Sequence, residues 1–422
     1  MRVLWLSNIQ TVTSVKGIGC SWIGSLEAEL SNKSDIRLGI SFSSNQPDTS
    51  EFYIGNTCYF PIGKAPVKSK FRRIYARYAH KIESEDNILI YLDIIKKFKP
   101  DLIHIFGSES DYGLIISKTA IPCIIHIQGN LTVINYKWFS GFSFLDVLKY
   151  SKKSLLIKGH GLFHDHLYFK KAVKREAKIC QECNFFLGRT DWDRRVISVL
   201  SPNSEYFHCD EIMRSGFYLK IWNPHPQQKD YTIFSTFKDS IYKGIETVFE
   251  SKRVLKLSFP ELNIIWKVAG IKETDEVSYF VERKFKNTFK NFNIQLLGQL
   301  QEDELIDELL KADLFVHASH IENSPNSVCE AMLLGMPVIS TYAGGTPSIL
   351  ADKIEGLLVQ DGDPYALAGA IIELMKDSEL AKKLGENARS KSLVRNNPGK
   401  IVNDVLSIYR SVLKKNNLNA EL

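Results

Sequence analysis

The chain has 422 residues, of which 44% are hydrophobic and 24% are charged. This composition is typical of a folded globular protein and excludes long disordered stretches, and the length predicts two domains of roughly 200 residues each. No stretch reaches the roughly 18 consecutive apolar residues that span a bilayer, and the short apolar run at the N-terminus predicts a buried strand instead of a signal peptide. We therefore expect a cytoplasmic protein.

The net charge of +6 is unevenly distributed. The segment from Lys137 to Lys178 contains ten Lys or Arg residues and only three Asp or Glu residues, and a second basic stretch runs from Lys68 to Lys81. Such surfaces are either solvated faces or binding surfaces for an anionic partner, here a membrane leaflet or a phosphate-bearing acceptor. No nucleic-acid-binding motif accompanies them, so we expect no nucleic-acid partner.

The cysteines indicate neither a disulfide framework nor a clear metal site. Their number is seven and their spacing is irregular. Cys180 and Cys183 form a C-x-x-C with histidines nearby in sequence, but no second such pair follows. Zinc binding and buried structural cysteines are both compatible with the pair, and the missing second pair favours the structural interpretation.

Short β-rich runs alternate with amphipathic helical patterns along the first half of the chain. The predicted strands are Val3–Leu6, Ile36–Ser41, Leu102–Phe106, Cys123–Ile127 and Phe185–Gly188, and the predicted helices include Asn87–Phe98 and Lys170–Cys180. Such alternation predicts a parallel sheet with helices on both faces.

A Pro-rich polar segment at residues 221–230 predicts a linker, after which the alternation restarts. The predicted strands there are Tyr231–Ser235, Ile264–Ala269, Ile294–Leu297, Leu314–His317, Pro337–Ser340 and Gly356–Val359. We therefore predict an α/β fold with domains at residues 1–220 and 221–400, and a C-terminal helix over about 400–422 that packs near the first. Ligands of two such domains bind at the carboxyl ends of the strands, in the cleft between them.

The stretch from His317 to Leu350 contains the largest group of candidate functional residues. A helix is predicted to begin near Asn326, and its orphan N–H groups and dipole favour a phosphate. The residues predicted to form this phosphate-binding end are Ser324, Asn326 and Ser327.

Two glutamates lie eight positions apart in this stretch. Glu330, one turn into the helix, has the geometry to accept hydrogen bonds from the two hydroxyls of a ribose. Glu322, in the preceding loop, is predicted to hold hydroxyls of a transferred sugar. Taken alone, Glu330 is equally an ordinary helix-surface residue.

The E-x7-E pattern, followed by Gly335-Met336-Pro337-Val338 and the Gly344-Gly345 turn, resembles the donor-site signature of family 4 glycosyltransferases. The resemblance covers most of the C-terminal half. It implies a GT-B architecture of two Rossmann-like domains. It also implies retaining transfer of a hexose or N-acetylhexosamine from a nucleoside-diphosphate sugar, with UDP as the expected nucleotide. The expected acceptor is a hydroxyl of a glycan or lipid-linked molecule in bacterial surface polysaccharide biosynthesis.

The resemblance also implies roles for residues upstream of the signature. Lys243, followed by Gly244, matches the residue that grips the donor diphosphate, where its charge would stabilise the leaving group. Lys238 stands where the family commonly has an arginine. Gly298 and Gln299 are expected to meet the nucleobase. With a lysine and a helix dipole neutralising the diphosphate, no metal or other cofactor is expected.

Acceptor-side residues are expected in the first half. Gly17 and Gly19 lie in a loop that does not match G-x-G-x-x-G and is predicted to face the acceptor. Gln128 occupies a position where the family usually has a histidine, and His126 lies two residues earlier on the same strand face. His126 is either a proton-handling group or a buried structural histidine. Arg189 is predicted to contact a phosphate or the acceptor.

Asp191-Trp192-Asp193 matches D-x-D by chance, and Asp191 is predicted to cap a helix. The expected mechanism needs no side-chain nucleophile, because an oxygen of the leaving diphosphate takes the acceptor proton while the enzyme positions the substrates and stabilises charge.

Two alternative functions stay open: a sugar-nucleotide epimerase of the same architecture, and a non-catalytic transferase-like scaffold. The basic stretches add the prediction of peripheral association with the inner face of a membrane.

Overall fold

The computed structural model describes residues 1–8, 21–44, 49–63, 75, 78–79, 85–225 and 230–420. The chain divides into two compact units. The first unit comprises residues 1–135, 167–212 and 396–422, and the second comprises residues 136–166 and 213–395. The domain boundaries expected from the sequence stay a prediction.

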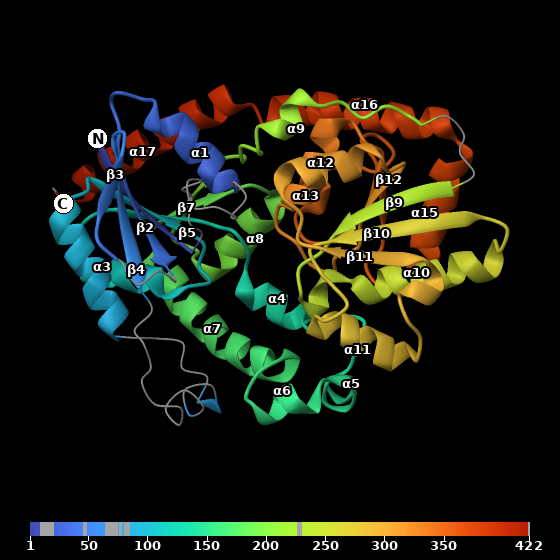
Figure 1. Ribbon diagram of the computed structural model, residues 1–422. Coiled ribbons are helices and arrows are strands. Elements are labelled where there is room, and N and C mark those ends of the chain that lie inside the picture. The colour runs from blue at the N-terminus through green and yellow to red at the C-terminus, as the bar shows by residue number, and fades with distance from the viewer. Residues whose placement is uncertain are drawn as a thin grey trace. The chain divides into compact units, whose positions relative to one another are not determined.

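The first unit is built on an eight-stranded sheet in the order β3-β4-β2-β1-β5-β6-β7-β8 (Figure 1). Every pair is parallel except the edge pair β3 and β4. The strands are β1 (Arg2–Ser7), β2 (Arg37–Ser44), β3 (Phe52–Ile54), β4 (Thr57–Gly63), β5 (Leu102–Phe106), β6 (Cys123–His126), β7 (Phe185–Gly188) and β8 (Glu205–His208).

Helices accompany this sheet, and the last of them returns from the far end of the sequence. They are α1 (Trp22–Ser31), α3 (Glu85–Phe98), the 3-10 helix η1 (Asp111–Lys118), α8 (Asp191–Leu200) and α17 (Pro398–Ala420), with α4 (Leu131–Lys137) and α7 (Leu162–Glu182) running across the unit boundaries in sequence. Tyr409 of α17 reaches the sheet: its hydroxyl lies 3.2 Å from Trp5 Nε1 and 2.6 Å from His104 Nδ1. Figure 1 shows α17 beside α1.

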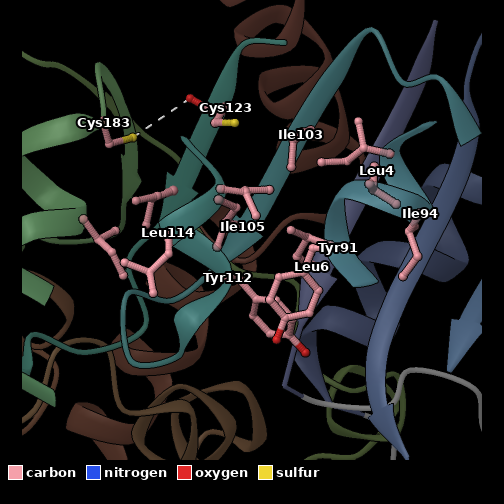
Figure 2. Packing of buried hydrophobic residues seen from close by; sticks show 14 of the residues in the cluster. Leu4, Leu6, Tyr91, Ile94, Ile103, Ile105, Tyr112, Leu114, Cys123 and Cys183 are labelled. Carbon is pink, nitrogen blue, oxygen red and sulfur yellow. Dashed lines mark hydrogen bonds between the residues drawn. The ribbon is translucent and has the colours of Figure 1, made fainter. Parts of the chain in front are cut away.

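The core of the first unit lies between this sheet and its helices, as Figure 2 shows for Leu4, Ile103 and Ile105. Parallel strands covered on both faces are apolar along nearly their whole length, which is the pattern of LIHIF in β5, where His104 is the one polar residue. Cys183 packs in this core, and its Sγ lies 4.0 Å from the Cys123 carbonyl oxygen. Cys180 and Cys183 are free and buried, as the structural interpretation expects.

The second unit is built on a six-stranded parallel sheet in the order β11-β10-β9-β12-β13-β14. The strands are β9 (Asp230–Thr236), β10 (Asn263–Ala269), β11 (Ile294–Gly298), β12 (Leu314–His317), β13 (Val338–Thr341) and β14 (Leu357–Val359). The helices are α5 (Phe144–Tyr150), α6 (Lys153–Ile157), α9 (Gly216–Leu219), η2 (Ile241–Lys243), α10 (Ile245–Ser258), α11 (Glu276–Phe285), η3 (Lys290–Phe292), α12 (Glu302–Leu310), α13 (Asn326–Leu334), α14 (Thr346–Ile349), α15 (Pro364–Lys376) and α16 (Ser378–Arg395).

Residues 136–166 pack on the second unit although they come from the first half of the sequence. The Phe142 ring meets Phe280 of α11 edge to face at 4.7 Å, and Lys284 Nζ of α11 lies 2.7 Å from the Asp146 carboxylate. Nearby, the Leu162 N–H donates to Glu276 at 3.1 Å. Aromatic packing and charge therefore hold this segment on α11.

The prediction of two Rossmann-like parallel sheets is confirmed. Three strands were not predicted, namely β3, β4 and β8. The capping prediction for Asp191 is wrong: Thr190 is the N-cap of α8, and its hydroxyl accepts from the Asp193 N–H while Asp193 accepts in return. A hydroxyl one residue before the first helical turn reaches that N–H, whereas Asp191 already lies inside the helix. No helix in the described part of the chain is both long and apolar enough to cross a membrane.

Candidate functional site

Lys243 and Glu322 form a largely buried ion pair in the second unit. Lys243 ends η2 and Glu322 lies in the loop between β12 and α13, at the carboxyl edge of the sheet. The His317 Nε2 also lies 3.4 Å from this carboxylate. Burial raises the pKa of Glu322, but Lys243 and His317 outweigh it and hold the pKa at about 2. Burial correspondingly lowers the pKa of Lys243, and Glu322 outweighs it, so both groups are charged.

Two glycines let the loops around this pair approach closely. Gly244 has φ = +79°, and a Cβ there would lie 1.9 Å from the Ala318 carbonyl oxygen. Gly344 has φ = +54°, and a Cβ there would lie 1.9 Å from the Glu322 carbonyl oxygen, which also accepts from the Gly345 N–H at 2.9 Å. Any side chain at either glycine would force the loops apart, because these distances are far below contact.

Glu330 is buried on α13, which begins at Asn326 as predicted. The Arg214 guanidinium donates to it from Nε at 2.7 Å. Burial raises the pKa of Glu330, and Arg214 opposes that rise. Arg214 was not predicted as a site residue, because 116 positions separate it from Glu330 and no local pattern joins them.

The amino end of α13 carries the polar residues that were predicted there. Ser324 is buried and lies 3.4 Å from Arg395 Nη2. The Asn326 Oδ1 is buried and has no hydrogen-bond partner in the described part of the chain, and Ser327 is half-buried. The Val328 N–H already donates to the Pro325 carbonyl at 3.0 Å, so the Asn326 and Ser327 N–H groups are the ones that this end can offer to an anion.

The other predicted donor residues lie on loops of the same edge. Gly298 ends β11 with φ = +74°, and Gln299 Nε2 donates to the Gly270 carbonyl at 2.8 Å. Lys238 follows β9 and is exposed, with no ion pair to another described residue. The carboxyl ends of parallel strands lie at one edge, so β9, β11 and β12 bring these loops to the same side of the sheet.

A second charged cluster, which was not predicted, lies next to the turn that carries Lys243. His320 contacts Glu246 through Nε2, and its Nδ1 lies 3.5 Å from Asp361. Lys137 Nζ lies 3.2 Å from the same Asp361 carboxylate. Burial lowers the pKa of His320, but the two carboxylates outweigh it and raise the pKa overall. The His320 N–H donates to the Tyr242 carbonyl at 3.0 Å, so the cluster supports the turn that carries the lysine of the first pair.

In the first unit, His126 ends β6 and is completely buried. Its ring packs against Trp22 at 5.0 Å and His104 at 5.4 Å, and neither nitrogen has a hydrogen-bond partner within the described ranges. Burial lowers the pKa of His126 far below its ordinary value, so the ring is neutral. Gln128 Nε2 donates to the His126 carbonyl at 3.3 Å.

Arg189 is buried after β7, where it donates to the carbonyls of Ile127 and Gln128 at 3.3 and 3.2 Å. Its Nη1 also lies 3.9 Å from the Glu211 carboxylate. Arg189 therefore holds the loop after β6, which is the loop that carries Gln128. Gly17 and Gly19, the other predicted acceptor-side residues, lie outside the described residues.

Glu109 was not predicted, although it follows a predicted strand. Its carboxyl group lies against the backbone of Gly107 and Gly129, at the carboxyl ends of β5 and β6. Burial raises the pKa of Glu109 to about 7, and the nearby Glu176 adds to the rise. A half-buried carboxyl with this pKa changes its charge near neutral pH.

Comparison with known proteins identifies relatives of both the sequence and the fold. Residues 220–391 match the family described as Glycosyl transferases group 1. An uncharacterized glycosyltransferase of Methanocaldococcus jannaschii, MJ1178, is 36% identical over 336 residues, which is 78% of each chain. The capsular polysaccharide biosynthesis glycosyltransferase CapM of Staphylococcus aureus is 25% identical over 173 residues, or 41% of this chain and 44% of that protein.

Two solved structures share the architecture over nearly the whole chain. Sucrose-phosphate synthase from Thermosynechococcus elongatus matches with a TM-score of 0.71 at 14% identity, covering 98% of this chain and 99% of that one. Anabaena HepE in complex with UDP-glucose matches with a TM-score of 0.64 at 14% identity, covering 97% and 100%. At these identities the likeness establishes the fold alone, which is the expected GT-B architecture.

Proposed function

Because the chain belongs to the group 1 glycosyltransferases, we propose that it transfers a hexose or N-acetylhexosamine, with retention, from a UDP-sugar to a hydroxyl of a glycan or lipid-linked acceptor. The observation that carries this proposal is the charged loop of Lys243 and Glu322 beside the amino end of α13, with Glu330 in that helix. The capsular polysaccharide relative supports a role in surface polysaccharide biosynthesis, and the UDP-glucose complex of the structural neighbour supports UDP.

In this proposal each charged group has a distinct partner on the donor. The diphosphate binds the amino end of α13 and the Lys243 ammonium, the ribose hydroxyls donate to Glu330, and the transferred sugar donates to Glu322. Lys238, exposed in the loop after β9, adds a second cation, while Gly298 and Gln299 meet the base. Glu330 is buried and Glu322 half-buried, each beside a cation, so their oxygens are held in position before the donor arrives.

The reaction we propose is front-face substitution at the anomeric carbon. The bond from this carbon to the diphosphate oxygen breaks, the acceptor oxygen forms the new bond on the same face, and a diphosphate oxygen takes the acceptor proton. Lys243 stabilises the charge that develops on the leaving diphosphate. Neither a side-chain nucleophile nor a metal takes part in the proposed step.

The acceptor is proposed to bind the first unit at the carboxyl ends of β6 and β7. Gln128 and Arg189 lie there; the acceptor-side role expected of Gly17 and Gly19 stays a prediction. A proton-handling role for His126 stays a prediction, and it requires that substrate reach a ring that is completely buried in the described structure.

A donor screen on the full chain tests the proposal. UDP and UDP-sugars are expected to raise the midpoint of thermal unfolding more than GDP or ADP does, and Glu330→Ala is expected to reduce the UDP shift. No shift with any nucleotide would favour the non-catalytic scaffold. Conversion of a UDP-sugar to its epimer without acceptor would favour the epimerase.

We further propose that the protein is cytoplasmic and binds the inner face of the membrane through residues 144–158, the helical surface formed by α5 and α6. Leu145 and Ile157 on this surface are 73% and 75% exposed. Lys149 and Lys153 are exposed beside them, whereas Lys152 is engaged with the Thr274 carbonyl at 2.8 Å. Exposed apolar side chains among lysines suit an anionic leaflet. Of the second basic stretch, only residues 75, 78 and 79 are described.

Vesicle co-sedimentation tests this surface. The full chain is expected to bind phosphatidylcholine vesicles that contain phosphatidylglycerol, and Leu145→Glu with Ile157→Glu is expected to release it. Leu219→Glu is the matched control, because Leu219 is 79% exposed in the same unit but lies outside this surface. Equal binding by the double variant and the control would contradict the proposal.

A further inference from the structure

Two arginines lie side by side at the amino edge of the first sheet, opposite the edge that carries the proposed acceptor residues. Arg2 begins β1 and Arg37 begins β2, and the parallel register pairs them directly. Neither guanidinium forms an ion pair with any carboxylate in the described ranges, and the Arg2 Nε is buried without a hydrogen-bond partner there. Like charges in register on neighbouring strands repel each other, and the Asp101 carboxylate nearby accepts from the Arg2 backbone N–H at 2.7 Å and not from its guanidinium.

These arginines line one cavity of about 670 Å³. Lys97, at the end of α3, adds a third cation to its wall, although that ammonium also pairs with Asp93 at 2.8 Å. Glu51 is the one acid among the lining residues that the structure describes. The wall is therefore positive, and its guanidinium groups have unused donors.

The rest of the wall consists of three aromatic residues together with Thr49 and Ser50. Phe60, Phe98 and Tyr53 line the cavity. The Arg2 guanidinium lies 4.9 Å from the centre of the Phe98 ring, within the range of a cation–π interaction. Tyr53, on the edge strand β3, is 56% exposed and presents a ring to an incoming ligand.

We infer that this cavity is a second binding site, separate from the donor residues, for a saccharide that carries a carboxylate or phosphate group. Arginine pairs bind such oxyanions through charge-assisted, often bidentate hydrogen bonds. The exposed Tyr53 ring provides a surface for the apolar face of a pyranose ring. The saccharide part of this inference rests on the proposed transferase function, whereas the oxyanion part rests on the arginines alone.

The test uses the full chain saturated with UDP, so that the donor site is occupied, and four probes: glucuronic acid, glucose 6-phosphate, glucose and inorganic phosphate. NMR titration is expected to show the two charged sugars binding more tightly than glucose or phosphate. Arg37→Gln should weaken the charged sugars by at least about tenfold, since it removes a charge-assisted hydrogen bond. Tyr53→Ala should weaken the sugars but leave inorganic phosphate unchanged.

Lys33→Gln is the matched control, because Lys33 is an exposed cation of the first unit that does not line the cavity. Equal binding by wild type and Arg37→Gln would overturn the site. Inorganic phosphate binding as tightly as glucose 6-phosphate would overturn its assignment to a saccharide. UDP binding, measured in the same samples, reports separately on the proposed donor site.

Discussion

The two acids of the candidate site in the second unit and the buried histidine of the first unit differ in what burial does to their charge. Glu322 and Glu330 each lie beside a cation, so burial leaves their carboxylates positioned for a ligand. His126 has no partner at either ring nitrogen among the described residues, and burial leaves it neutral. The comparison indicates that charge is preorganised at the proposed donor site, whereas His126 contributes packing in the described structure.

Removing the Lys243 ammonium should cause the largest loss of transferase activity. Lys243→Ala should lower kcat by about 10²–10³-fold, the cost typical of losing one preorganised group that stabilises transition-state charge. Steady-state transfer kinetics measure this. Lys267→Ala is the matched control, because it removes a half-buried lysine that pairs with Glu308 in the same unit. An equal loss of kcat in both variants would mean that the effect is structural.

Glu330→Ala should weaken UDP binding by roughly ten- to a hundredfold, because hydrogen bonds to a charged group contribute about 1.5–3 kcal/mol. Isothermal titration measures the change. Glu308→Ala, which removes another ion-paired glutamate of the second unit, should leave UDP affinity unaltered. Unchanged UDP affinity in Glu330→Ala would remove the ribose assignment.

Arg214→Gln should weaken UDP binding less than loss of Glu330 itself, and the deficit should grow at acidic pH. Arg214 opposes the burial that raises the pKa of Glu330, so its removal raises that pKa further. The protonated acid then predominates up to a higher pH and accepts ribose hydrogen bonds poorly. UDP titrations across the acidic range measure this. A deficit that does not depend on pH would show that Arg214 does not act through the charge of Glu330.

The ion pair of Glu322 should also contribute to stability in a definite pH window. Its folded pKa, about 2, lies below the ordinary 4.5, so its stabilisation is present above pH 4.5 and is lost as the pH falls toward 2. The stability advantage of wild type over Glu322→Gln in urea unfolding should shrink across this interval. An advantage that stays constant would contradict the lowered pKa.

The smallest effect on activity is expected from a substitution in the first unit, at His126, because this side chain contributes packing. His126→Gln should lower the free energy of unfolding by about 1–3 kcal/mol, the usual cost of disturbing a buried polar side chain. UDP affinity should stay the same. Urea unfolding and UDP titration together measure this. Loss of transfer with unchanged stability would instead support a catalytic role for the ring.

The sequence by itself determined the alternation of strands and helices, and hence two parallel sheets, because strands buried on both faces carry continuous apolar runs. It also located the loop of Glu322 and the helix of Glu330, since both belong to one short contiguous motif. Short edge strands such as β3 escaped prediction, because three residues carry too little periodicity.

Only the tertiary structure decided which distant residues meet. Arg214 reaches Glu330 across 116 positions, residues 136–166 pack on the second unit, and Arg2 stands beside Arg37 through strand register. Pairings of this kind depend on how whole elements pack, and no local pattern encodes them. Burial, and with it the charge state of His126 and Glu109, likewise follows from packing rather than from the identity of the residue.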